Sequence, residues 1–323
     1  MVAKTFMQAI CEAQAEELRR DPTVFLMGED VQWDIYGKTT GLLREFGPER
    51  IRDTPICEEV IVGAGIGAAM TGMRPIVDTT IASFLYLAVD QLVSQASKIR
   101  YMFGGQAKVP LVCRSALYYG GGNAAQHSDR NYPMFMQVPG LTIAMPASPR
   151  DAKGLLKTAI RNDEVVLFFE DGNITGREEI PDDELIPFGK ARIRRDGDDV
   201  TIVALGGSVP AALRAGDRLE EKGISAEVID PRTLVPLDED AIIASVEKTG
   251  RLILAEPASR TCGACAEIAA IVSERAFNAL LAPIGRVTTP QTHIPYSPVL
   301  ERPLYPNADR IAAAAETAFK WSR

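Results

Sequence analysis

The chain has 323 residues, of which 46% are hydrophobic and 24% charged, so it holds enough apolar material for about two globular domains. Its 35 Lys and Arg residues against 43 Asp and Glu give a net charge of −8, and without a basic block nucleic-acid binding is disfavoured. No apolar run approaches the roughly 20 residues of a membrane-spanning helix, which argues against a membrane partner.

Short β-rich apolar runs alternate with helical stretches in the first half of the chain. This alternation is typical of an α/β domain with a largely parallel sheet. One helix is predicted to begin at Ser148 and Pro149, a pair that suits a cap followed by the first helical turn. The predicted strands are 24–28, 74–81, 109–115, 141–147 and 165–170, and the predicted helices are 4–20, 58–71, 84–101 and 148–161.

The alternation stops between Asp171 and about Gly197, where the chain is polar, acidic and interrupted by proline and glycine. That composition is typical of a link between domains. We therefore predict two doubly wound α/β domains, over residues 1–180 and 199–323, with an interdomain link over 181–198. In the second domain the predicted strands are 199–207, 225–234, 251–257 and 285–289, and the predicted helices are 208–222, 238–248, 264–278 and 309–321.

The segment DTPICEEVIVGAGIGAAMTG, residues 53–72, has two interpretations. In the first, a short strand leads into a dinucleotide-binding turn built on Gly63, Gly65 and Ala68, with Asp78 as partner of the ribose. The protein would then be a flavin- or NAD-dependent oxidoreductase. Two adjacent carboxylates directly before the supposed strand, and a following helix of barely two turns, argue against this interpretation.

In the second interpretation a helix begins at Glu58, just after a proline, and includes the glycines. Glu58, Val62, Gly65, Ala69 and Gly72 then share one helix face. Because this face has little side-chain bulk, another backbone can approach it closely. A carboxylate at the start of such a helix is either a favourable partner of the helix dipole or a catalytic group.

Two further segments carry candidate site residues. Phe84 and Tyr86 follow the predicted strand 74–81, where aromatic side chains belong either to the core or to a site. The glycine-rich stretch 116–133 is long for a loop inside a compact domain, and such loops are often functional. It contains His127, whose imidazole titrates near neutral pH and is suited to proton transfer. A solvated loop histidine is the alternative.

Five cysteines, a sparse and odd number, indicate a reducing compartment. With no signal-peptide pattern at the N-terminus, we expect a cytoplasmic protein, or one of the mitochondrial matrix if eukaryotic. Only Cys262 and Cys265 are close together, at the start of a predicted helix. They are either a redox pair, whose thiols the helix amides activate, or simply two small, half-buried residues at a helix start. No second C-x-x-C or nearby histidine completes a zinc site.

Segments spread through almost the full length resemble one family, the beta subunits of pyruvate, branched-chain 2-oxo-acid and acetoin dehydrogenases. They include MGEDV (27–31), FGPERIRDTPICE (46–58), QHS (126–128), EVIDPRTLVPLD (227–238) and SVEKTGRLILAEP (245–257). The resemblance implies a transketolase-like pyrimidine-binding domain followed by a transketolase C-terminal domain. It also implies an alpha-2 beta-2 heterotetramer with an alpha subunit, bound to a lipoyl acyltransferase core.

The resemblance further implies thiamine diphosphate, shared with the alpha subunit. The alpha subunit would also hold Mg²⁺, which explains why this sequence lacks the Gly-Asp-Gly clamp of thiamine enzymes. By the same resemblance, the Glu58 carboxylate hydrogen-bonds N1′ of the aminopyrimidine and favours the imino tautomer, which takes the proton from thiazolium C2. Ile56 and Phe84 line the pyrimidine pocket, Tyr86 lies nearby, and His127 takes part in acyl transfer to lipoamide.

The function implied is oxidative decarboxylation of pyruvate or a branched-chain 2-oxo acid, with acyl transfer to lipoamide. Acetoin cleavage is a close variant, and a non-catalytic paralogue that only scaffolds its partner is another alternative. Two positions depart from the family pattern: Asp129 follows QHS in place of Gln, and Gln137 replaces a histidine before PGL. A structural K⁺ is also implied, bound by the backbone carbonyls of Leu111, Ala159, Ile160 and Asn162.

Overall fold

The computed structural model describes residues 3–321, which fold as two compact α/β units. The first unit comprises Met1–Leu117 and Met134–Phe188, and the second comprises Tyr118–Pro133 and Gly189–Arg323. The second unit therefore includes the segment Tyr118–Pro133, which in the sequence lies between the two parts of the first unit. This assignment was not predicted, because the loop 116–133 carries no strand or helix pattern of its own.

The first unit is built on a parallel sheet whose strands lie in the order β5-β6-β4-β3-β1-β2. Strands β1, β4 and β6 are fully buried, as expected when helices cover both faces of a parallel sheet, whereas the edge strand β2 is buried only at Ile51. The strands are β1 (Val24–Gly28), β2 (Ile51–Asp53), β3 (Arg74–Ile81), β4 (Val112–Leu117), β5 (Thr142–Ala144) and β6 (Val166–Asp171).

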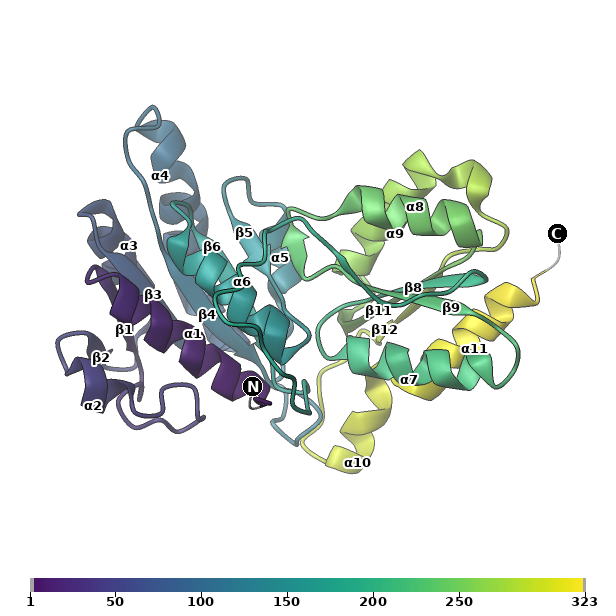
Figure 1. Cartoon of the computed structure of the whole chain (residues 1–323), viewed down its shortest axis with the longest axis horizontal. Coiled ribbons are helices and arrows are strands. Elements are labelled where there is room, and N and C mark those ends of the chain that lie inside the picture. The colour runs from purple at the N-terminus through teal and green to yellow at the C-terminus, as the bar shows by residue number, and fades with distance from the viewer. Residues whose placement is uncertain (1–2, 322–323) are drawn as a thin grey trace. The chain divides into compact units, whose positions relative to one another are not determined.

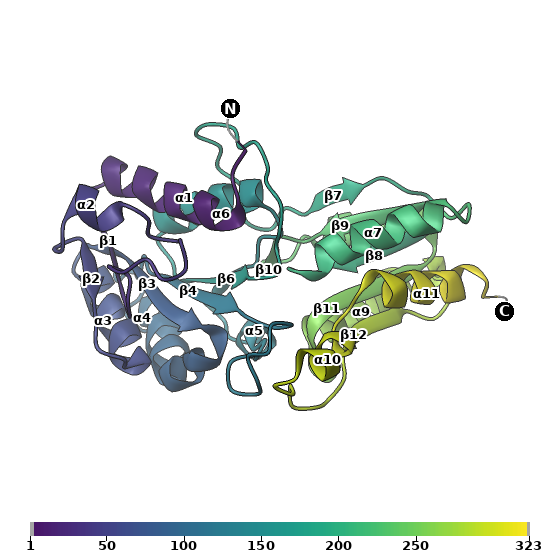
Figure 2. The ribbon, with the colours of Figure 1, turned by 90° about the horizontal axis from the view of Figure 1, so that it is seen from below.

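Helices α1 and α6 lie side by side on one face of this sheet, and α3 and α4 lie on the other (Figure 2). Side-chain caps fix where α1 and α6 begin. Thr5 and Gln8 form a capping box at the start of α1, and Ser148 accepts from the third helical residue of α6, as predicted. The helices are α1 (Phe6–Arg20), α2 (Leu42–Phe46), α3 (Glu58–Met70), α4 (Ser97–Met102), α5 (Tyr132–Met136) and α6 (Pro149–Arg161).

Buried ion pairs join α1 to α6. Lys153 and Lys157 of α6 are at most 2% exposed, and their ammonium groups lie 2.6 Å and 2.7 Å from the two carboxylate oxygens of Glu16. Burial alone would raise the pKa of Glu16, but the two lysines outweigh it and lower that pKa. The pairing therefore compensates the charges that these helices bury.

The helix predicted over 84–101 is instead three consecutive pieces. A 3₁₀ helix, η1 (Ala82–Ala88), is followed by a π-helix, η2 (Gln91–Ala96), and then by α4. The Ser97 hydroxyl donates to the Val93 carbonyl at 2.8 Å in this region. Period alone does not separate these helix types, and π segments often occur at functional sites.

The second unit contains a sheet in the order β12-β11-β8-β9-β7, parallel except where β7 pairs with β9. Helices α7 and α11 cover one face, and α8 and α9 the other (Figures 1 and 2). Strand β7 lies within the predicted link. The elements are β7 (Arg192–Arg195), β8 (Val200–Ala204), α7 (Ser208–Glu220), β9 (Ala226–Asp230), β10 (Thr233–Val235), α8 (Glu239–Thr249), β11 (Leu252–Ser259), α9 (Ala264–Arg275), η3 (Phe277–Ala279), β12 (Gly285–Thr289), α10 (Pro298–Glu301), η4 (Arg302–Leu304) and α11 (Ala308–Phe319).

Across residues 3–321, none of the helices combines the length and the apolar character needed to cross a membrane.

Candidate active site

Candidate side chains gather where the parallel strands of the first unit end. In the sheet register Gly28 of β1 lies opposite both Asp53 of β2 and Asp78 of β3. Because the carboxyl ends of parallel strands meet at one edge, the segments that follow them lie close together, and ligands of open α/β sheets bind at such edges. These segments carry Glu29 after β1, residues 54–58 after β2, and η1 after β3.

Glu58 is the first residue of α3, as the second interpretation of residues 53–72 predicted. Its side chain is 5% exposed, and its carboxylate makes no hydrogen bond or ion pair with any residue in the range 3–321. A buried carboxylate normally requires such a partner. This carboxylate is therefore suited to hydrogen-bond a group that is not part of the chain.

A second carboxylate, that of half-buried Glu29, lies within electrostatic range of Glu58. Burial raises the pKa of Glu29, and the charges of Asp30 and Glu58 raise it further. Glu29 was not predicted as a site residue. Its position directly after a buried strand, inside the MGEDV segment, was the signal that was available.

The other predicted pocket residues lie at the same edge. Ile56, two residues before Glu58, is 71% exposed, and Phe84 is half-buried in η1, which packs against α3. Tyr86 is 48% exposed in the same 3₁₀ helix. The structure thus brings Glu58, Ile56 and Phe84 to one edge, and their roles in binding remain predictions.

Two buried polar atoms near this edge lack hydrogen-bond partners among the described residues. They are Oγ1 of Thr54, in the turn before α3, and Oε1 of Gln91, the first residue of η2. The amide nitrogen of Gln91 donates to Glu59 at 3.3 Å. Unsatisfied buried oxygens are uncommon in proteins, so we regard both as groups suited to contact a bound molecule.

The dinucleotide-binding interpretation is wrong because residues 58–70 form one helix, with Gly63, Gly65 and Ala68 in its interior and no strand before them. The small-residue face is also not free for another chain. Glu58, Val62, Gly65 and Ala69 are buried against the chain's own sheet, whereas Gly72 is exposed beyond the end of the helix. A Cβ atom at Gly65 would lie only 2.7 Å from Cγ1 of Val77 in β3.

Alanine substitutions at two glycines of α3 are therefore expected to have opposite effects on the stability of the chain. Gly65→Ala forces a methyl group into the core and is expected to destabilise the chain by about 1–3 kcal/mol. Gly67→Ala adds its methyl group in open space and is expected to stabilise the chain by about 0.5–1 kcal/mol, since alanine restricts the unfolded state. Denaturant unfolding followed by circular dichroism measures both, and equal effects of the two substitutions would refute this packing of α3.

A buried ionic cluster lies near the ends of β3, β4 and β6. Arg114 Nε lies 2.6 Å from Glu170 Oε1, and Lys38 Nζ lies 2.7 Å from Glu170 Oε2. Arg114 also pairs with Asp78 at 3.4 Å and donates to Gln14 at 2.7 Å. Lys38 thereby fixes the segment between β1 and α2 to the interior of the unit. Sequence analysis did not predict this cluster.

His127 is exposed, and it belongs to the second unit through the segment 118–133. Its neighbours Ser128 and Asn131 are only 1% and 5% exposed, so the loop that carries it is partly packed. The structure therefore places His127 and Glu58 in different units.

The four carbonyls predicted to bind K⁺ all accept hydrogen bonds from protein groups. Those of Leu111 and Ala159 accept from backbone N–H groups, and those of Ile160 and Asn162 accept from Nη1 of Arg74 at 3.1 Å and 2.8 Å. Because a guanidinium already supplies positive charge there, the geometry gives no support to K⁺. Within residues 3–321 no three His, Cys, Asp or Glu side chains are grouped to hold a metal ion.

The two cysteines of the C-x-x-C differ in their surroundings. Cys262 is exposed, whereas Cys265 is buried at the start of α9, where its backbone N–H donates to Glu256 at 2.8 Å. Burial, and then the charge of Glu256, raises the pKa of Cys265 well above its ordinary value. The helix start therefore does not activate this thiol, and the packing interpretation is favoured.

Comparison with known families covers most of the chain. Residues 3–175 match the family described as "Transketolase, pyrimidine binding domain", and residues 189–311 match "Transketolase, C-terminal domain". A solved structure described as "Split gene transketolase, inactive beta4 tetramer" covers 100% of this chain and 99% of its own, with a TM-score of 0.80 and 23% identity. The two units thus have the transketolase-like fold that the sequence predicted.

Similar proteins of known name are beta subunits. The beta subunit of acetoin:2,6-dichlorophenolindophenol oxidoreductase of Bacillus subtilis (strain 168) is 46% identical, over 94% of each chain. The 2-oxoisovalerate dehydrogenase subunit beta of the same organism is 44% identical, over 97% of this chain and 98% of that protein. The pyruvate dehydrogenase E1 component subunit beta of Rhizobium meliloti (strain 1021) is 41% identical, over 98% of this chain and 70% of that protein.

Proposed function

The chain belongs to the family of beta subunits of the thiamine-dependent 2-oxo-acid and acetoin dehydrogenases, and on this premise we propose that it supplies the pyrimidine-facing half of a thiamine diphosphate site. The reaction proposed is oxidative decarboxylation of pyruvate or a branched-chain 2-oxo acid, with acyl transfer to lipoamide. The observation that supports it most is the buried Glu58 carboxylate, which has no partner among the described residues.

Acetoin cleavage is the second candidate reaction. Of the three relatives compared above, the one named for acetoin has the highest identity, 46%. The Glu58 site serves both reactions alike, because each needs the same activated cofactor and differs only in the substrate carbonyl that is attacked. The substrate pocket would lie largely on the alpha chain.

Thiamine diphosphate, when bound, supplies a nucleophilic carbon and an electron sink. Glu58 would hydrogen-bond the aminopyrimidine nitrogen N1′, because its side chain is buried and its carboxylate has no hydrogen-bond partner among the described residues. Phe84 and Ile56 would provide apolar walls that exclude water from the ring. Thr54 and Gln91 have buried oxygens free to position the same ring system.

His127 would serve the later step, transfer of the acyl group to a lipoyl group. In this step the lipoyl S–S bond breaks, one sulfur takes the acyl group, and the other takes a proton. The two electrons that reduce the disulfide come from the acyl donor. We propose that His127 supplies the proton, because it is exposed and an imidazole side chain can act as a general acid.

As a beta subunit, the chain functions with an alpha partner. The first unit offers exposed apolar side chains on α3, on η1, at the end of α4 and at the residue after it, and exposed apolar patches of this kind mark protein interfaces. We propose that the alpha chain covers them in an alpha-2 beta-2 heterotetramer. The side chains are Val60 (62% exposed), Met70 (43%), Leu87 (63%), Tyr101 (90%), Met102 (60%) and Phe103 (54%).

The remaining features of the complex are extensions of this proposal. The alpha chain would hold the diphosphate and Mg²⁺, since this sequence lacks the Gly-Asp-Gly clamp. A lipoyl acyltransferase core would bind the tetramer and receive the acyl group. The compartment proposed is the cytoplasm, or the mitochondrial matrix in a eukaryote.

Reconstitution tests this function. The purified chain alone is expected to be colourless and to turn over neither pyruvate, branched-chain 2-oxo acids nor acetoin. Co-expressed with an alpha chain that bears Gly-Asp-Gly, and given thiamine diphosphate and Mg²⁺, it is expected to turn over at least one of them. Turnover by the chain alone would overturn the proposal, as would failure of every alpha partner with which it assembles.

The same co-expression locates the alpha interface. Val60→Lys places a charge on the exposed face of α3 and is expected to lower the yield of co-purified alpha chain at least tenfold, since a buried unpaired charge is costly. Leu185→Lys is the matched control, because Leu185 is 45% exposed but lies outside this face. Equal yields of the two variants would exclude α3 from the interface.

A further inference from the structure

The start of the loop that carries His127 is hydrogen-bonded to a buried carboxylate. Glu301, the last residue of α10, is 0% exposed, and both of its carboxylate oxygens are used. One accepts from the Gly120 N–H at 2.6 Å and from the Tyr305 hydroxyl at 2.9 Å, and the other accepts from the Gly122 N–H at 2.7 Å. All of these groups belong to the second unit.

The end of the loop is hydrogen-bonded to a second buried carboxylate. The Tyr132 hydroxyl donates to Glu256 at 2.8 Å, and the backbone N–H groups at the start of α9 hold the same carboxylate. The Arg130 guanidinium also donates to the Pro257 carbonyl at 2.9 Å. Gly122 and Tyr132 each lie five residues from His127 in the sequence, so the loop is fixed on both sides of the histidine at equal spacing.

The glycines at the start of the loop are required by this geometry. Gly120 and Gly122 have φ values of 79° and 80°, in the left-handed region that favours glycine. A Cβ atom at Gly122 would lie 3.1 Å from the carbonyl oxygen of Tyr296. Backbone N–H groups that converge in this way form an anion-binding concavity, and here the anion is the Glu301 carboxylate.

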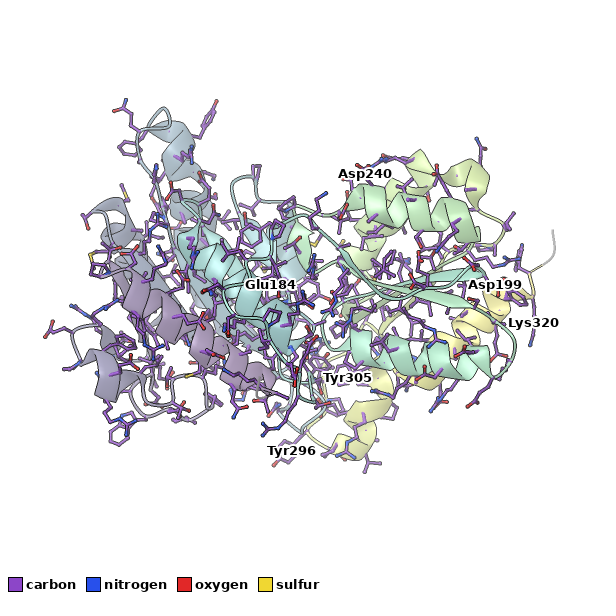
Figure 3. The ribbon with its side chains drawn as sticks, viewed as in Figure 1. Glu184, Asp199, Asp240, Tyr296, Tyr305 and Lys320 are labelled. Atoms are coloured by element: carbon purple, nitrogen blue, oxygen red, sulfur yellow. The ribbon has the colours of Figure 1, made fainter. Side chains whose placement is uncertain are left out.

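Aromatic packing reinforces the same attachment. The rings of Tyr119 and Tyr305 lie 4.7 Å apart between centroids, and Figure 3 shows Tyr305 beside the α10 segment. The Arg130 guanidinium lies 5.2 Å from the Tyr305 ring and 5.9 Å from the Tyr119 ring. The loop therefore packs on its own unit through both backbone and side chains.

We propose that Glu301 is a positioning residue, which fixes the glycine-rich start of the loop and thereby places His127 for acyl transfer to the lipoyl group. The inference rests on the proposed role of His127. A loop held in its working geometry before the lipoyl group arrives avoids an ordering cost during transfer, and displacement by about 1 Å can cost about 100-fold in rate.

The test uses the reconstituted alpha–beta enzyme and two electron acceptors. Lipoamide acylation needs the histidine loop, whereas 2,6-dichlorophenolindophenol takes the two electrons directly and needs no acyl transfer to sulfur. Glu301→Gln keeps the side-chain shape but replaces one accepting oxygen by an amide nitrogen. We expect acylation to fall about 10- to 100-fold and dye reduction to change less than twofold.

Amide hydrogen exchange gives a second readout that does not depend on chemistry at His127. In Glu301→Gln the Gly120 and Gly122 amides are expected to exchange faster, while amides in the β8–β11 core keep their protection. If Glu301→Gln fails to fold, Gly122→Ala tests the same attachment from the loop side and is expected to give the same split between acceptors. Equal loss with both acceptors would show a general structural effect and overturn the inference.

His127→Ala separates this inference from the proposal on which it rests. It is expected to lower lipoamide acylation at least as much as Glu301→Gln does. If His127→Ala lowers acylation and Glu301→Gln does not, the role of Glu301 alone is refuted. If His127→Ala leaves acylation unchanged, the proposed role of the histidine is refuted, and the inference is refuted with it.

Discussion

Replacing Glu58 with glutamine is expected to lower the turnover number of the reconstituted enzyme by about 10²–10⁴-fold, the range that general acid–base catalysis contributes. The amide keeps the size of the side chain but loses the negative charge that favours a proton on the aminopyrimidine nitrogen. Steady-state assay with the dye acceptor measures this loss without a contribution from acyl transfer to lipoamide.

Assembly should survive the Glu58 substitution, because the carboxylate makes no hydrogen bond or ion pair with a described residue of its own chain. Size-exclusion chromatography of the co-expressed pair checks this. Glu59→Gln is the matched control: Glu59 is the next residue and is exposed, and the glutamine keeps an oxygen that can accept the 3.3 Å hydrogen bond from the Gln91 amide. It should change turnover less than threefold. A Glu58→Gln enzyme as active as this control would refute the catalytic role of Glu58.

The largest expected effect on stability comes from Glu170→Gln. Glu170 is 0% exposed and lies between Arg114 and Lys38, so its removal leaves two buried cations without their shared anion. Removing one partner of a buried ion pair typically lowers the free energy of unfolding by about 3–5 kcal/mol. Urea unfolding of the isolated chain should show this as a lower midpoint with an unchanged slope.

Burial distinguishes this carboxylate from a surface one. Glu45 makes a bidentate pair with Arg19 at 2.5 Å and 2.8 Å, but both side chains are about half exposed, so Glu45→Gln should lower the urea midpoint far less than Glu170→Gln does. Adding Lys38→Met to Glu170→Gln removes one stranded charge and should recover part of the loss. Equal costs at Glu170 and Glu45 would contradict the buried cluster.

Glu170 is also expected to make the stability of the chain depend on pH. Burial alone would raise the pKa of Glu170, but Arg114 and Lys38 outweigh it and lower the pKa to about 2 from an ordinary value of 4.5. Because the folded pKa lies below the unfolded one, this contribution is present above about pH 4.5 and is lost as the pH falls toward 2. The Glu170→Gln chain should therefore lose less stability over that interval than the unmodified chain.

Local sequence patterns predicted the helices whose starting points are set by neighbouring residues. The helix that begins at Glu58 and the one that begins after Ser148 appear where their start signals stand. The break of 84–101 into 3₁₀, π and α pieces was missed, because all three have similar periods. Strand β7 was missed because three of its four residues are arginines and none of the four is buried at this sheet edge.

The site was predictable only in part, for the same reason. Glu58 stands at the start of a predicted helix, whereas Glu29 and Thr54 lie near it because parallel strands end at one edge of the sheet. The hydrogen bonds of Arg114 to Glu170 and of Gly120 to Glu301 join residues that are 56 and 181 positions apart in the sequence. A single sequence does not encode such pairings in any local pattern.

Hydrogen–deuterium exchange at thiazolium C2, followed by quenched-flow NMR of the reconstituted complex, measures directly whether Glu58 activates the shared cofactor. With the unmodified chain, exchange should accelerate strongly when the alpha chain is added, and with Glu58→Gln it should stay near the rate of free thiamine diphosphate. Fast exchange in the Glu58→Gln complex, or on this chain without alpha, would contradict the proposed site.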